Sequence, residues 1–165
     1  GGKPYTGQLP AFDPKAKTAV LMVNGFNGVG LHTLFGTTRL FGQAFKNFVF
    51  VEVGVVDAGN FKGAQEVEHL EENIKTDTER YVKFMQKNGF YAEAISVIGV
   101  DVVKEIEGIA PEILQRFPNA VFFGGQLIFP NDSFIVRFLH NYTVFALQKR
   151  LYRQGIPFVI LPLRV

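Results

Sequence analysis

Glycine is concentrated in one short segment, residues 24–30, which reads Asn24-Gly25-Phe26-Asn27-Gly28-Val29-Gly30. Backbone N–H groups in such a segment can approach an anion closely, and a helix that begins after it adds partial positive charge. We expect that helix to begin near Leu31. The spacing G-x-x-G-x-G is neither the dinucleotide-binding G-x-G-x-x-G nor the phosphate-binding loop with its Lys and Ser/Thr. Two interpretations stay open: a site for a small anion or nucleotide phosphate, or glycines that only permit a tight turn.

Further residues extend this candidate site. Gly124 and Gly125 follow another apolar run, and Asp57 ends a third, where an acid binds ribose in nucleotide-binding folds. An acid in a surface loop also has ordinary structural explanations. The predicted ligand-binding residues are therefore Gly25, Asn27, Gly28, Gly30, Asp57, Gly124 and Gly125.

Catalytic patterns are missing from the sequence. Ser96 and Ser133 are its two serines, and neither lies in the G-x-S-x-G pattern of a nucleophile elbow. The three histidines have no metal-binding spacing, and there is no cysteine to supply a thiolate. We therefore predict a protein that is not an enzyme, with no catalytic residue, no metal and no cofactor.

The composition favours one folded domain. The chain has 165 residues, of which 47% are hydrophobic and 19% charged, the reverse of the balance in disordered segments. A net charge of +2, with no basic cluster beyond Lys149, Arg150 and Arg153, does not suggest a nucleic-acid partner. No signal-peptide pattern opens the chain, and no apolar stretch approaches the ~20 residues of a membrane span. These features predict a soluble intracellular domain.

Five short apolar runs have the character of strands that are covered on both faces. Between them lie segments with helical spacing, so the chain alternates between strands and helices, and right-handed crossovers then require a parallel sheet. We predict a three-layer, doubly wound α/β fold of Rossmann-like type, with a five-stranded sheet in the order 3-2-1-4-5. Residues 1–16 are expected to form an extended leader and residues 17–165 the domain. The predicted strands are Thr18–Val23, Phe48–Val56, Tyr91–Ile98, Ala120–Phe123 and Pro157–Leu161.

Sequence signals also mark the helix boundaries. Asn88-Gly89 is expected to end the second helix, and Asp101 can cap the third. Pro111 interrupts the third helix, so either the helix kinks near Gly108 or a new turn begins there. The apolar stripe of the second helix is expected to comprise Val67, Leu70, Ile74, Tyr81 and Phe84.

The fourth helix is expected to start after Asp132 or Ser133 and to run to about Arg153. Its apolar residues occupy more than one stripe, so one side should face the sheet and the other a second chain. Eighteen phenylalanines without a tryptophan are more aromatic residues than one small core needs. The sequence therefore predicts a homodimer, with interface residues Phe138, His140, Tyr142 and Phe145.

Several stretches of the chain resemble a known family over residues 17–165. They are Phe48-Val49-Phe50-Val51 leading into Gly54-Val55-Val56-Asp57, Phe61-Lys62-Gly63, Ala120-Val121-Phe122-Phe123-Gly124-Gly125 with Leu127, Leu139-His140-Asn141, Gln148 with Arg150-Leu151, and Ile160-Leu161-Pro162-Leu163-Arg164-Val165. Together they resemble the cytosolic carboxy-terminal domain of bacterial amino-acid permeases of the amino acid–polyamine–organocation superfamily.

This resemblance implies a regulatory or assembly domain on the cytoplasmic side of the inner membrane, with the transmembrane part of the same permease as its partner. It also implies a fold similar to the universal stress proteins, some of which bind ATP through a pattern G-x-x-G, a spacer and then G-[S/T]. Gly124-Gly125 is followed by Leu127, Ile128, Phe129 and Pro130, with no later Gly-Ser or Gly-Thr. ATP is therefore not expected as a ligand on the strength of this resemblance.

Overall fold

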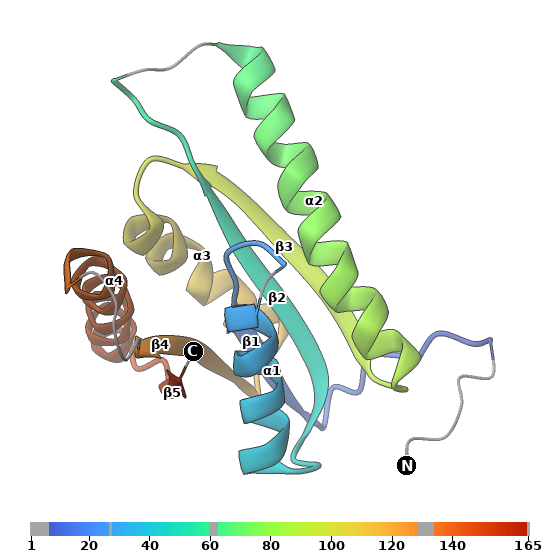
Figure 1. Ribbon diagram of the computed structural model, residues 1–165. Coiled ribbons are helices and arrows are strands. Elements are labelled where there is room, and N and C mark those ends of the chain that lie inside the picture. The colour runs from blue at the N-terminus through green and yellow to red at the C-terminus, as the bar shows by residue number, and fades with distance from the viewer. Residues whose placement is uncertain (1–6, 27, 60–62, 129–133, 165) are drawn as a thin grey trace.

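The computed structural model describes residues 7–26, 28–59, 63–128 and 134–164, and Figure 1 shows their arrangement. These residues alternate between strands and helices along the whole chain. The elements are β1 (Lys17–Met22), α1 (Gly28–Phe41), β2 (Phe45–Val55), α2 (Ala64–Lys87), β3 (Tyr91–Gly99), α3 (Val102–Arg116), β4 (Ala120–Ile128), α4 (Phe134–Arg153) and β5 (Phe158–Arg164). Among the described residues no helix is both long enough and apolar enough to cross a membrane.

The strands form one sheet in the order β3-β2-β1-β4-β5, and every neighbouring pair is parallel. This confirms the predicted fold class and strand order. Helices α1 and α2 cover one face of the sheet, and α3 and α4 cover the other (Figure 1). The order reverses between β1 and β4, whose carboxyl ends therefore diverge to helices on opposite faces.

Strand β2 shows why the continuous apolar runs predicted doubly covered strands. Val49 and Val51 pack toward α3 and α4, whereas Phe48 and Phe50 pack toward α1 and α2. Side chains alternate between the two faces of a strand, so a strand with helices on both sides needs apolar residues at every position. All four side chains are at most 1% exposed.

Helix α1 begins at Gly28, three residues before the predicted start at Leu31. Glycine is a weak helix former, so the helix start predicted from the sequence was too late. Gly28 and Gly30 consequently belong to the first turn of the helix rather than to the preceding loop.

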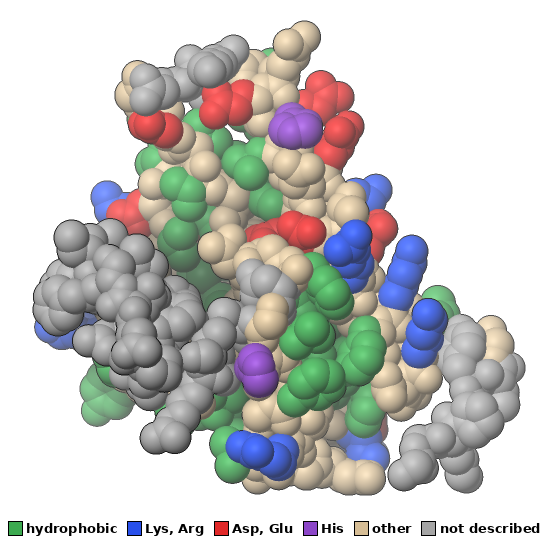
Figure 2. All heavy atoms as spheres, in the orientation of Figure 1, with side chains coloured by type: hydrophobic (Ala, Val, Ile, Leu, Met, Phe, Trp, Pro, Cys, Tyr) green, Lys and Arg blue, Asp and Glu red, His purple; other side chains and the backbone are tan. Residues whose placement is uncertain are grey.

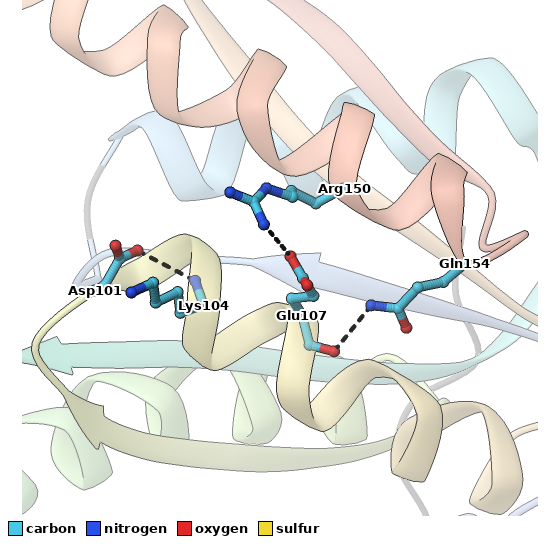
Figure 3. Close-up of polar contacts among 5 residues, drawn as sticks. All are labelled: Asp101, Lys104, Glu107, Arg150 and Gln154. Carbon is cyan, nitrogen blue, oxygen red and sulfur yellow. Dashed lines mark hydrogen bonds and ion pairs between the residues drawn. The ribbon is translucent and has the colours of Figure 1, made fainter.

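The boundaries of the other helices follow the predictions closely. Gly89 adopts a positive φ of 84° directly after α2, and the Asp101 side chain accepts a hydrogen bond from the Lys104 N–H at the start of α3 (3.1 Å, Figure 3). In α2, the predicted stripe residue Phe84 is 36% exposed, and it packs edge to face against Phe35 of α1. Figure 2 shows hydrophobic side chains exposed over α1 and α2 in this region.

Pro111 lies inside a continuous α3 rather than dividing it. Proline has no N–H, so the carbonyl of Glu107, four residues earlier, loses its intrahelical donor. The side chain of Gln154, just after α4, donates to that carbonyl instead, at 3.3 Å (Figure 3). The Glu107 side chain also pairs with Arg150 of α4 at 3.4 Å. The carbonyl that proline leaves without an intrahelical partner thus has a donor from the end of the neighbouring helix.

Residues before β1 close the amino-terminal end of the sheet. The ring of Phe12 lies edge to face with Tyr91 and Phe117, with centroids 5.5 and 5.3 Å apart. Asn47, fully buried in β2, accepts a hydrogen bond from the Asp13 N–H at 3.1 Å and donates to the Asp13 carbonyl at 2.8 Å. This end of the molecule is thus filled by side chains and hydrogen bonds.

The contact at Pro111 gives a prediction for stability. Gln154→Ala should lower the free energy of unfolding by about 1 kcal/mol, because the Glu107 carbonyl loses its donor. In a Pro111→Ala background the same change should cost much less, because the substituted alanine supplies an intrahelical N–H. Chemical denaturation of the native chain, the two single variants and the double variant measures this coupling. Arg150→Ala, which removes the exposed ion pair, should change stability by less than about 0.5 kcal/mol. Equal costs of Gln154→Ala in both backgrounds would contradict the explanation.

Candidate functional site

A cavity of about 580 Å³ lies at the carboxyl ends of β1, β2 and β4. This is the point where the strand order reverses, the usual ligand position in open α/β sheets. Residues from all four helices contribute to its lining, together with the loop after β1 and the last residues of β2. Its size is suitable for a small organic molecule.

The structure brings four of the predicted ligand-binding residues to this cavity: Gly25, Gly30, Gly124 and Gly125. Gly28 opens α1 without lining the cavity, and Asp57 lies in a turn, where its side chain accepts from the Gly59 N–H at 2.9 Å. Asn27 lies outside the described residues. Gly124 and Gly125 lie within β4, where they pair with Ile160 and Leu161 of β5, so the prediction that they form a loop after a strand ending at Phe123 is wrong. Strands β1 and β4 nevertheless bring Gly25 and this glycine pair to one cavity, as expected at the reversal point.

Gly25 is the residue on which the loop after β1 turns, with a φ of 75°. Its N–H donates to Oε1 of Glu52 in β2, and its carbonyl accepts from the Tyr81 hydroxyl of α2 at 2.8 Å. Both backbone polar groups of Gly25 are thus bound by side chains of the protein. The amide that was predicted to face an anion is instead held by a carboxylate.

Two other glycines make room for aromatic rings. A Cβ on Gly30 would overlap the hydroxyl of Tyr81, a side chain with no exposed surface. A Cβ on Gly124 would lie 2.7 Å from the ring of Phe158. Packing accounts for glycine at both positions, and at Gly30 this reason is neither an anion site nor a tight turn.

Glu52 gives the cavity its electrostatic character. The residue is 3% exposed, and its Oε2 is buried without a hydrogen-bond partner. Burial raises the pKa of the Glu52 carboxyl, and the negative charge of Asp77 on α2 raises it further. The hydrogen bond from the Gly25 N–H lowers this pKa, but burial is the largest effect, so the pKa is raised overall. Asp77 also lines the cavity, whereas no lysine, arginine or histidine is among its described lining residues.

Glu52, Asp77 and Tyr81 were not among the predicted site residues. A signal for Glu52 exists in the sequence, because it is the single charged residue within the apolar run 48–56. A carboxylate in a doubly covered strand must be buried or lie at a cavity. Asp77 carries no such signal, since it occurs in a helix with many exposed charges.

The predicted interface residues lie on α4. Tyr142 and Phe145 are 65% and 47% exposed, and the side chains of Phe138 and His140 lie outside the described residues. Tyr152 is 80% exposed on the same stripe, seven residues after Phe145. Val144, Leu147 and Leu151 are buried against the sheet. The described part of α4 therefore carries apolar side chains on two sides, and on the exposed side Lys149 and Arg153 lie among the aromatic residues.

The fit of Gly30 under Tyr81 can be tested by substitution. Gly30→Ala should lower the free energy of unfolding by about 1–3 kcal/mol, because Tyr81 must move and weaken its bond to Gly25. Gly28→Ala is the matched control: a Cβ there meets no atom within 4 Å, so stability should be unchanged or slightly higher. Thermal or urea denaturation measures both variants. Equal effects of the two substitutions would contradict the packing explanation.

Glu52 predicts a specific dependence of stability on pH. Its pKa in the folded state is raised above the ordinary 4.5, so the stability it contributes is present at low pH and is lost as the pH rises through the folded-state pKa. Glu52→Gln keeps the acceptor for Gly25 and does not ionise. The melting temperature of this variant, relative to the native chain, should therefore rise from pH 4 to pH 8.

The exposed Glu79→Gln on α2 serves as the control for this measurement, and its difference from the native chain should not vary with pH in that way. A Glu52→Gln curve parallel to the native one over pH 4–8 would show that the buried carboxyl has no raised pKa.

Comparison with known proteins finds no matching family from the sequence and no curated protein that matches it. Solved structures do match. A protein of the universal stress protein family from Burkholderia pseudomallei has a TM-score of 0.60 at 15% identity, covering 89% of this chain and 96% of its own. Universal stress protein UspA from Lactobacillus plantarum has a TM-score of 0.58 at 10% identity, covering 88% and 97%. At these identities the likeness shows the fold, which is that of the universal stress proteins.

Proposed function

We propose that this chain is a non-catalytic regulatory and assembly domain of an amino-acid permease, placed on the cytoplasmic side of the inner membrane beside the transmembrane part of the same protein. The likeness of residues 17–165 to such domains supports the connection to transport. The observation that carries the assembly role is the exposed aromatic stripe of α4, formed by Tyr142, Phe145 and Tyr152.

The partner proposed for this stripe is a second copy of the chain. Large exposed aromatic residues at helical spacing are costly in water unless another surface covers them. The groove beside Tyr152 is bounded by Gln148 and Lys149 of α4 and by residues 156–159, which lead into the edge strand β5. A two-fold axis close to α4 would place the same aromatic residues of both copies against each other.

Light scattering at high protein concentration tests the assembly role. The native chain should be dimeric, and the double variant Phe145→Ser with Tyr152→Ser should be monomeric and folded, because both side chains are already exposed. Phe35→Ser, which removes a 49% exposed ring from the α1–α2 surface, is the matched control and should remain dimeric. A monomeric native chain, or a dimer disrupted by Phe35→Ser alone, would overturn the proposed α4 interface.

The reading frame that contains this chain tests the connection to transport. It should encode a series of apolar segments, each of about 20 residues, upstream of the domain. A frame without such segments would leave the fold unchanged but would refute the role in a permease.

A second candidate function is a small-ligand sensor. The cavity at the carboxyl ends of the strands favours it. A 580 Å³ cavity lined by a buried carboxylate, one oxygen of which has no hydrogen-bond partner, is unusual in a purely structural core. The two functions are compatible, since the cavity and the exposed stripe of α4 lie on different sides of that helix.

A further inference from the structure

We propose that the cavity binds a small organic cation, with an ammonium group held by the carboxylates of Glu52 and Asp77 and with its hydrocarbon part against the apolar wall. This inference deepens the sensor function and does not depend on the link to a permease. It also replaces the anionic ligand that the glycine loops suggested with a ligand of the opposite charge.

The first argument is the unsatisfied oxygen of Glu52. Oε1 accepts the Gly25 N–H, whereas Oε2 of the same carboxyl is buried without a hydrogen-bond partner, and Glu52 is among the residues that line the cavity. A buried carboxylate oxygen without a donor is costly, so native structures nearly always provide one. Within the described residues nothing supplies this donor, and a ligand N–H would supply it.

The second argument is the sign of the charge. Glu52 and Asp77 are the titratable side chains among the described residues that line the cavity, and both are acidic. A phosphate or carboxylate placed there would meet two like charges and a loop amide that is already bound. An ammonium group would instead be attracted by both carboxylates in a space partly shielded from water.

The third argument separates an organic cation from a metal ion. Among the described residues no group of three or more His, Asp or Glu side chains could hold a metal. Calcium takes six to eight oxygen ligands, and two carboxylates fall well short of that number. On the face of the sheet where Glu52 lies, the apolar lining of the cavity includes Leu70 and Ile74 of α2, which suit a hydrocarbon chain.

Calorimetry and thermal shift with simple amines test the proposal directly. The probes are n-butylamine, 1,4-diaminobutane and lysine, and their neutral controls are n-butanol and 1,4-butanediol at the same ionic strength. At least one amine should bind saturably and raise the melting temperature by about 5–10 °C at 100 times its Kd. The alcohols match the amines in length and lack the charge, so they should have no effect.

Variants locate the bound cation. Glu52→Gln should weaken amine binding about 100-fold, and Asp77→Asn about 10-fold, because each removes one of the two charges that hold the ammonium group. Glu79→Gln removes an exposed charge two residues after Asp77 and should leave the affinity unchanged. Circular dichroism of each variant confirms that it is folded.

Proton release gives an independent readout. Burial and the charge of Asp77 raise the pKa of Glu52, and an ammonium group beside its carboxylate would lower this pKa again, so binding favours loss of a proton from Glu52. Calorimetry in buffers of different ionisation enthalpy should therefore detect proton release on binding, which disappears in Glu52→Gln. Affinity should rise with pH until Glu52 is fully ionised.

Several results would overturn the proposal. They are equal shifts with the alcohols, unchanged affinity in Glu52→Gln, binding of Mg²⁺, Ca²⁺ or ATP in place of the amines, and no binding of any amine up to about 10 mM, where a millimolar site would be filled. None of these results alters the expected dimer or the reading frame. Failure of the cation site and failure of the permease role can thus be distinguished.

Discussion

The hydrogen bonds that meet at Gly25 hold the carboxyl ends of the strands in their observed arrangement. Glu52 of β2 accepts from its N–H, and Tyr81 of α2 donates to its carbonyl. Three elements far apart in the sequence are joined through a single residue, and the absence of a Cβ on Gly30 gives the Tyr81 hydroxyl the space to reach it. The loop after β1 is therefore fixed by the core, and its backbone amide at Gly25 is not available to a ligand.

This arrangement has an electrostatic consequence. Nucleotide sites in doubly wound folds place backbone N–H groups and a helix amino terminus against phosphate. Here the carboxylate of Glu52 accepts the hydrogen bond of the Gly25 N–H. A second carboxylate, Asp77, lies close enough to raise the pKa of Glu52. In this chain the doubly wound fold thus presents an acidic cavity at a position where a bound anion would need basic or neutral surroundings.

The sequence was sufficient for the fold because its signals were local. Apolar runs mark the strands, although β3 includes Glu93 and Ser96 and is only partly buried. Gly89 and Asp101 mark helix ends, and right-handed crossovers restrict the order of parallel strands. The site was less predictable because its determinants are pairs distant in the chain. Glu52 and Asp77 are 25 residues apart. Gln154 donates to the carbonyl of Glu107, a contact between two helices that the sequence does not indicate. The predicted start of α1 was late for a local reason, since Gly28 and Gly30 are weak helix formers and yet lie in its first turn.

Helix α4 connects the two proposed activities physically. Thr143, Val144 and Leu147 line the cavity, while Tyr142, Phe145 and Tyr152 face outward. A ligand in the cavity would contact the inner side of the helix whose outer side is the proposed dimer surface. Thermodynamic linkage then sets the condition for regulation: a cation alters dimerisation only if it binds monomer and dimer with different affinity, and dimerisation must alter cation affinity by the same factor. Because α4 is packed against the sheet through Leu147 and Leu151, such a difference requires the helix to have two arrangements on this core, and a rigid α4 would leave the two activities independent.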